Sequence, residues 1–214
     1  MNLKTIDDKL NEGRSYRDFQ SFEKREEDEG KSVTGYATVY STPYELWSLD
    51  GHTVREQIDP HAFDEADLSD VIMQYNHEGR VFARSSNGTL HLDSDDVGLK
   101  IRADLSGTEL GRQLYEEIAG GYTTKMSFGF TVAEDKREVT ENVENNTVDV
   151  LRTITKIKKL FDVSAVSLPA NDATSISARS YGEGVIAEAR EEIRAREERE
   201  RQKQKIRILL EVQK

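Results

Sequence analysis

The run Met126-Ser127-Phe128-Gly129-Phe130 places one small hydroxyl inside an otherwise apolar stretch. Side chains of a β-strand alternate between its two faces, so Met126, Phe128 and Phe130 are predicted on one face and Ser127 and Gly129 on the other. Glycine has no side chain, and an extended peptide can therefore come close to the backbone beside Ser127. The run predicts a half-buried strand that displays a serine next to open space.

A serine hydroxyl becomes a good nucleophile only when a base removes its proton, and histidine is the usual base. The run from Asp70 to His77 reads as a buried strand that ends in Asn-His-Glu-Gly, which predicts an imidazole at a strand-to-turn junction. Such residues more often have no chemical role: most serines in strands are neutral, and most histidines at strand ends are surface groups. His77 and Ser127 are therefore candidates for a base and a nucleophile.

The composition suits one domain with polar extensions. The chain has 214 residues, of which 33% are charged, and its mean hydropathy is −0.71. It has no cysteine, which excludes a disulfide framework, a thiol nucleophile and a cysteine-type zinc site. The four histidines show no ligand spacing, so no metal and no cofactor are expected. No window is long and apolar enough to cross a bilayer, and a soluble, intracellular protein is predicted.

The net charge of −11 lies in residues 1–182, because acids and bases nearly balance from Glu183 to Lys214. Nucleic-acid binding needs concentrated Lys and Arg, so an acidic body argues against such a partner. Three segments follow from composition. They are a flexible charged arm at 1–31, a compact domain at 32–180 and a mixed-charge helical tail at 181–214.

The compact domain contains many predicted strands. An Asn87-Gly88 pair predicts a tight hairpin, and a polar loop is expected over 134–146. One interior helix is predicted, with a capping box of Ser106 and Glu109 and an end at Gly120-Gly121. Strands without βαβ alternation predict an antiparallel barrel with peripheral helices. The strands are expected at 33–40, 52–58, 71–76, 80–84, 89–92, 99–105, around Ser127, at 147–157 and at 160–168.

Short motifs follow one another in a specific order over roughly residues 33–179. They are Gly35-Tyr36-Ala37, Arg55 to Phe63, Asn76-His77, Gly88-Thr89-Leu90, Gly98-Leu99, Gly120-Gly121, Ser127 to Phe130 and Val163 to Ala170. This ordered set resembles one known family, the prohead maturation proteases of tailed bacteriophages.

The resemblance implies an α+β, mostly β fold: a closed antiparallel β-barrel surrounded by helices, as in the herpesvirus assemblins, followed by the helical tail. It implies a serine endopeptidase that cuts scaffold or capsid-precursor segments, and also itself. It further implies a homo-oligomer that works in the cytoplasm of the bacterial host, inside the immature capsid.

The resemblance also assigns site residues. The histidine after Asn and the serine before Phe-Gly-Phe imply His77 as base and Ser127 as nucleophile. Similar phage enzymes have an acidic residue where Asp162 stands, which makes Asp162 the expected partner of the base. Alternatives for this third position are Asp172, Glu78 and His91.

Several points stay open from the sequence. The donors that stabilise an oxyanion are undecided among Arg84, Arg179 and the amides near Pro169 to Asn171. The chain departs from the family pattern at His61, where glycine is usual, and at Ala83, so nearby loops are expected to differ in shape. Two other classes of function remain, namely a non-catalytic capsid assembly protein with the same fold and a β-barrel that binds a small ligand.

Overall fold

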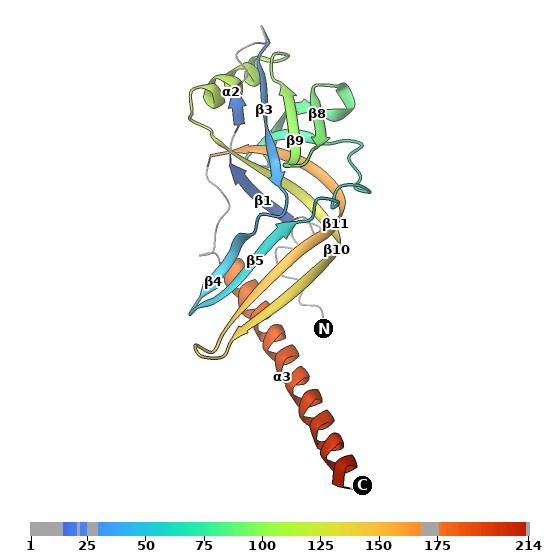
Figure 1. Cartoon of the computed structure of the whole chain (residues 1–214). Coiled ribbons are helices and arrows are strands. Elements are labelled where there is room, and N and C mark those ends of the chain that lie inside the picture. The colour runs from blue at the N-terminus through green and yellow to red at the C-terminus, as the bar shows by residue number, and fades with distance from the viewer. Residues whose placement is uncertain (1–14, 21, 25–29, 168–175, 213–214) are drawn as a thin grey trace.

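The computed structural model describes residues 15–20, 22–24, 30–167 and 176–212 (Figure 1). The described part of the chain is mostly β, as the sequence predicts, and contains one short and one long α-helix. The α-helices are α2 (Glu109–Ala119) and α3 (Ile176–Val212), and η1 (Ser85–Asn87) is a 3₁₀ turn. The strands are β1 (Ser15–Gln20), β2 (Phe22–Lys24), β3 (Ser32–Val39), β4 (Tyr44–Leu49), β5 (His52–Ile58), β6 (Ile72–Tyr75), β7 (Glu78–Arg84), β8 (Leu90–Ser94), β9 (Gly98–Asp104), β10 (Lys125–Asn142) and β11 (Thr147–Val166).

The strands form two sheets. One has the order β1-β10-β11-β5-β4, with β6 also paired to β11 and β7 paired to β6; the other has the order β2-β3-β9-β8. Neither sheet closes on itself among the described strands, so the predicted closed barrel is not confirmed. The expectation of a purely antiparallel sheet is wrong, because β11 pairs in parallel with both β5 and β6. At 20 residues, β11 is long enough to accept these two short strands one after the other.

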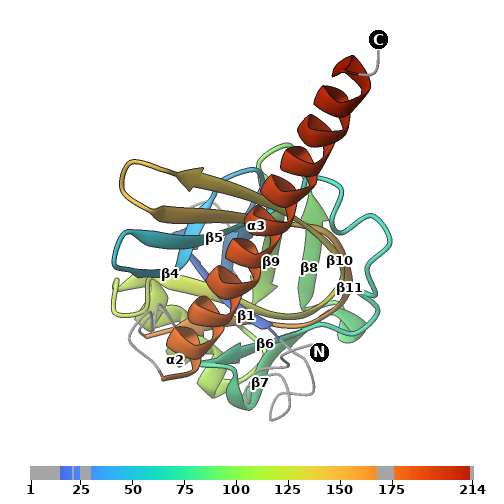
Figure 2. The same ribbon diagram turned by 90° about the horizontal axis from the view of Figure 1, so that it is seen from below.

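The hairpin of β10 and β11 spans most of the molecule and bends around it (Figures 1 and 2). The predicted polar loop at 134–146 is wrong, because β10 continues to Asn142 and only residues 143–146 form the turn. The predicted break between 157 and 160 is also wrong, since β11 is continuous there. Four register shifts between 129 and 135 accompany this bend, as β-bulges increase local twist.

Other local expectations also differ from the structure. The predicted hairpin at Asn87-Gly88 is wrong, because β7 and β8 lie in different sheets and η1 joins them. Gly88 does take a positive φ of 76°. The segment 1–31, expected to be a flexible arm, contributes β1 and β2, and β4 was not predicted. Helix α2 is capped by Thr108, whose hydroxyl accepts a hydrogen bond from the N–H of Gly111 at 2.9 Å, and not by Ser106.

The main core lies between the two sheets. Met126, Phe128 and Phe130 are fully buried in it, and the last two rings stack at 4.5 Å between centroids. The open space predicted beside Ser127 is wrong, because Ser127 and Gly129 on the other face of the strand are buried as well. Leu114 of α2 joins this core, whereas Leu110 is 37% exposed.

A second core joins helix α3 to the far half of the β10–β11 hairpin, which is the half that contains the turn at 143–146. Trp47 of β4 packs there with valines of β5 and β11, and the same cluster contains Val185, Ile186, Ala189 and Ile193 of α3. The predicted tail is thus a helix, but its first half is docked on the sheet. From Arg194 to Leu209 the side chains are exposed. The C-terminal part of α3 projects away from the strands (Figure 1). No described helix is both long and apolar enough to span a membrane.

The larger sheet curls strongly, and a buried carboxylate marks the inside of the curl. Glu56 of β5 has no exposed surface. It accepts hydrogen bonds from Arg17 Nε at 2.6 Å, Tyr44 OH at 2.6 Å and Arg152 Nη1 at 2.9 Å. In a flat sheet β1 and β5 would be three strands, or roughly 14 Å, apart. The contact between Arg17 and Glu56 therefore requires the sheet to fold toward a barrel-like shape.

Candidate active site

Three side chains, two from strands and one from a turn, meet on the face of the large sheet opposite the main core. The imidazole of His77 lies between the other two, with Nε2 2.6 Å from Ser127 Oγ and Nδ1 2.5 Å from Asp162 Oδ1. Ser127 comes from β10, Asp162 from β11 and His77 from the turn between β6 and β7. The structure thus brings together the three residues that the sequence singles out.

His77 owes its position to an unusual turn. Tyr75 and Glu78 are paired, so Asn76 and His77 form a two-residue hairpin loop, and both have positive φ, 50° and 59°. Two such angles in succession are typical of a type I′ turn, which matches the twist of the flanking strands. Asn and His adopt this left-handed conformation more readily than most residues other than glycine. The local sequence therefore supports a turn that aims the imidazole sideways from the end of β6.

The turn is tied to the end of β11. The N–H of Asn76 donates to the carbonyl of Ala165 at 2.9 Å, and its Oδ1 accepts from the N–H of Ser167 at 3.0 Å. The N–H of His77 donates to Ser164 Oγ at 3.3 Å. These bonds fix the backbone that carries the imidazole relative to the strand that carries Asp162.

Ser164 is a site residue that the sequence reasoning missed. It lies directly opposite Ser127 in the β10–β11 register, and its hydroxyl donates to Asp162 Oδ1 at 2.9 Å while accepting from His77 N–H. The only signal in the sequence is the spacing of Asp162 and Ser164, which places both on one face of a strand. Ser164 therefore connects the carboxylate to the backbone of the histidine turn.

The site is deeply buried. Ser127 and Ser164 have no exposed surface, Asp162 is 3% exposed, and the His77 side chain is 16% exposed. A buried carboxylate is costly unless it is hydrogen-bonded, and here Asp162 is bonded to both His77 and Ser164. With Nδ1–H donating to Asp162, Nε2 of His77 presents its lone pair to the Ser127 hydroxyl. This is the arrangement of a nucleophile, a base and a group that orients the base.

The remaining candidates lie elsewhere or outside the described residues. Glu78 is exposed at the start of β7, and His91 is exposed on β8 of the other sheet. Arg84 Nε donates to Asp70 Oδ1 at 2.7 Å, and this ion pair lowers the pKa of Asp70 to about 2. Asp172 and the stretch from Pro169 to Asn171 lie outside the described residues. Arg179 falls within α3, but its side chain is not described.

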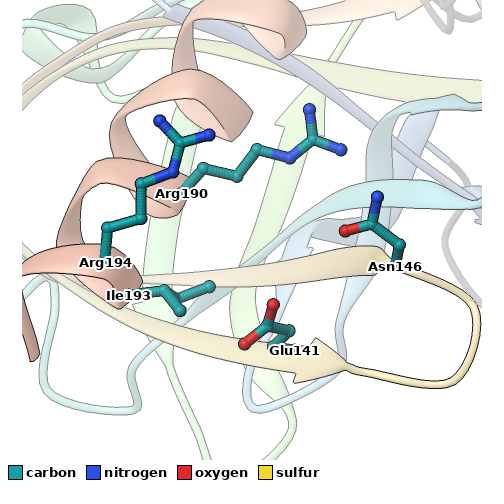
Figure 3. A pocket seen from close by; sticks show the side chains of 5 residues that line it. All are labelled: Glu141, Asn146, Arg190, Ile193 and Arg194. Carbon is teal, nitrogen blue, oxygen red and sulfur yellow. The ribbon is translucent and has the colours of Figure 1, made fainter. Parts of the chain in front are cut away.

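Two hollows open on the surface of the described part of the chain. One, of about 410 Å³, adjoins the histidine turn and is lined by Tyr75, Asn76, Phe82 and Leu110 among others. The other, of about 200 Å³, lies between the tip of the β10–β11 hairpin and α3, where Arg190 and Arg194 project over Glu141 and Asn146 (Figure 3). Only the first is adjacent to the proposed chemistry. No cluster of potential metal ligands occurs among the described residues.

Comparison with known proteins gives one match. A family model described as caudovirus prohead serine protease matches residues 20–185, which is most of the chain and includes all three residues of the site. Neither the curated proteins nor the solved structures compared with the chain include a match.

Proposed function

The chain belongs to the caudovirus prohead serine protease family, and from this premise we propose that it is a serine endopeptidase with Ser127 as nucleophile, His77 as base and Asp162 as the group that orients His77. The observation that carries the proposal is the continuous chain of hydrogen bonds from Ser127 Oγ through the imidazole to Asp162 Oδ1. A serine aligned in this way with a histidine and a buried acid is suited to acyl transfer.

The geometry supports a two-step mechanism. Ser127 Oγ attacks the carbonyl carbon of a peptide bond while His77 Nε2 takes the hydroxyl proton, and Asp162 stabilises the resulting imidazolium. His77 then gives this proton to the departing amine, the C–N bond breaks, and an acyl-enzyme is left on Ser127. A water molecule attacks the ester, again with His77 as base, and releases the carboxylic acid and the free serine. No step needs a metal ion or a cofactor.

The family gives the proposed setting. Membership of this family supports a role in prohead maturation. We further propose that the substrates are scaffold or capsid-precursor segments inside an immature phage capsid in the bacterial cytoplasm, and that the enzyme also processes its own chain. We propose that it acts as a homo-oligomer. Nucleic acid is not a proposed partner, because the body of the chain is acidic.

A serine-directed fluorophosphonate tests the chemistry. Wild type is expected to be labelled at Ser127, whereas Ser127→Ala is expected to remain unlabelled. Ser106→Ala, which removes an exposed hydroxyl next to α2, is the matched control and should be labelled as wild type is. Co-expression with the capsid precursor should give shortened precursor with wild type and full-length precursor with Ser127→Ala. Shortening by Ser127→Ala would contradict the proposal.

The burial of the serine favours one second candidate. Ser127 has no exposed surface, which suits a protein that has the fold of a protease but acts only in capsid assembly. Its projecting mixed-charge helix, the part of α3 beyond Ile193, would then bind the capsid protein. Absence of labelling and of cleavage, with capsid assembly that still depends on the chain, would support this function over the first.

A further inference from the structure

Strand β1 occupies the backbone edge beside the candidate nucleophile. It pairs in antiparallel register with Lys125 to Phe130 of β10, and Asp18 lies directly opposite Ser127. β1 is the last strand on this side of the sheet. The edge of β10 next to Ser127 is thus filled by a segment from the N-terminal part of the same chain.

The other side of Ser127 is taken by the site itself. β11 lies there with Asp162 and Ser164, and β6, which leads into the histidine turn, pairs with the far edge of β11. A peptide that pairs with β10 beside Ser127 can therefore bind only on the side where β1 lies. Residues opposed across an antiparallel pair have Cα atoms about 4.5–5.5 Å apart, which brings the main chain of an adjacent strand near the hydroxyl.

Two further observations indicate that another strand could replace β1 at the edge of β10. Ser127 has no exposed surface while β1 is paired to β10, so part of the protein must move before a substrate can contact the hydroxyl. The family match begins at residue 20, and β1 lies before it except for its last residue. The edge of β10 lies within the residues that match the family, whereas β1 lies almost wholly before them.

Arg17 of β1 indicates which side chain a strand bound at this edge should carry. It lies opposite Phe128, one residue before the position opposite Ser127, and its guanidinium bonds to Glu56 through Nε at 2.6 Å and Nη2 at 3.3 Å. Glu56 is fully buried, and its pKa is lowered: burial acts to raise it, but the charges of Arg17 and Arg152 outweigh that effect. A strand that displaces β1 without a cation at this position removes one of the hydrogen-bonded charges that offset the burial of Glu56.

We propose that the β10 edge from Lys125 to Phe130 binds substrate as an added β-strand, that β1 competes for this edge, and that the preferred substrate carries arginine opposite Phe128. This inference rests on the proposed peptidase function. Strand addition provides affinity through main-chain hydrogen bonds, while the buried Glu56 selects the basic residue.

A disulfide lock tests the competition. The chain has no cysteine, so Gln20→Cys with Lys125→Cys, which are opposed in register, creates a single possible bond between β1 and β10. Oxidation is expected to slow fluorophosphonate labelling of Ser127 by about tenfold or more, because it lowers the fraction of open sites, and dithiothreitol should restore the rate. Asp93→Cys with Lys100→Cys, opposed in β8 and β9, is the matched control, and its oxidation should not change labelling.

Loosening β1 should have the opposite effect. Arg17→Gln removes the charged contact with Glu56 and is expected to speed labelling severalfold relative to wild type. This variant keeps the proposal testable if the double-cysteine chain does not fold.

Peptide libraries test the preference for arginine. Two fluorogenic libraries differ only at the position proposed to lie opposite Phe128. This position holds arginine in one library and glutamine in the other. Wild type should cleave the arginine library about tenfold faster, and Glu56→Gln should reduce the ratio toward one, because the amide carries no charge. The ratio is internal to each variant, so a general loss of activity does not affect it.

The outcomes separate the two proposals. Equal labelling of locked and reduced protein, or equal cleavage of both libraries by wild type, overturns the substrate-strand proposal and leaves a Ser127-dependent peptidase. No labelling and no cleavage by any form overturns the proposed function, and the substrate-strand proposal with it.

Discussion

At the scale of single residues, the site depends on hydrogen bonds that converge on one carboxylate. Asp162 accepts from both His77 and Ser164, and Ser164 in turn accepts from the backbone N–H of His77. Local sequence makes Ser127 and His77 candidates, and the resemblance to the family adds Asp162. Ser164 does not stand out in the sequence, because its contacts depend on the register of β10 against β11, which no local pattern specifies.

Replacing Ser164 tests whether it positions the acid and the base. Ser164→Ala removes a hydrogen bond to a carboxylate, which is worth about 1.5–3 kcal/mol, so kcat/KM should fall about ten- to a hundredfold. The loss should be in kcat with KM unchanged, because Ser164 is not proposed to touch substrate. Asp162→Asn, the stronger comparison, should lose about 10³–10⁴-fold. A Ser164→Ala enzyme with wild-type kcat and only a lower Tm would show a purely structural role.

At the scale of elements, the β10–β11 hairpin connects the site to helix α3. Its near half carries Ser127 and Asp162, and its far half packs against the docked part of α3. The far half reads as a loop in sequence because the five residues from Glu134 to Glu138 are all charged and all exposed. A strand with polar residues on both faces has no alternation to detect. The helical tail could be predicted from composition, but not its docking on Trp47.

Gly182 permits this docking. A Cβ atom at residue 182 would lie 2.1 Å from Cδ2 of Trp47, so Gly182→Ala cannot be accommodated without moving the helix. Overpacking of this kind costs about 1–3 kcal/mol, and the free energy of unfolding should fall accordingly. Trp47 is 3% exposed and is the only tryptophan, so its fluorescence emission should shift to the red. Ala187→Ser, on the exposed side of α3, should change neither quantity, and an unshifted Gly182→Ala spectrum would contradict the docking.

At the scale of the whole molecule, pairings between distant segments determine the shape. β11 joins β5 and β6 in parallel, although about 90 residues separate the paired positions in the chain. Hydrophobic periodicity predicts individual strands but not their partners, which is why the mostly β class was predictable and the arrangement in two sheets was not. The buried Glu56 cluster follows from the same curling, since it joins β1, β4, β5 and β11.

Glu56 should make the stability of the whole fold depend on pH. Its pKa is lowered in the folded state, so its contribution is full above the unfolded value of 4.5 and is lost as the pH falls through the lower folded value. Urea unfolding of wild type should therefore show a free energy that declines below about pH 4.5. Glu56→Gln should be less stable at pH 7, by about 3–5 kcal/mol for a broken buried ion pair, but should decline less steeply in acid.

An exposed acid provides the control for this experiment. Glu138→Gln, at an exposed position of β10 in the same sheet, should follow the wild-type curve. If the free energy of unfolding declined equally steeply in acid for wild type and Glu56→Gln, Glu56 would not be the cause of the decline.

The left-handed backbone at His77 has a consequence for chemical rescue. With φ at 59°, glycine fits this position better than alanine, so His77→Gly should keep the turn while leaving a vacancy shaped like an imidazole ring. Free imidazole added to this variant should enter the vacancy between Ser127 and Asp162 and restore part of the peptidase rate in proportion to its concentration. Benzene-sized molecules without a basic nitrogen should restore none. Activity that returned equally with both additives would mean that the ring serves only to fill space.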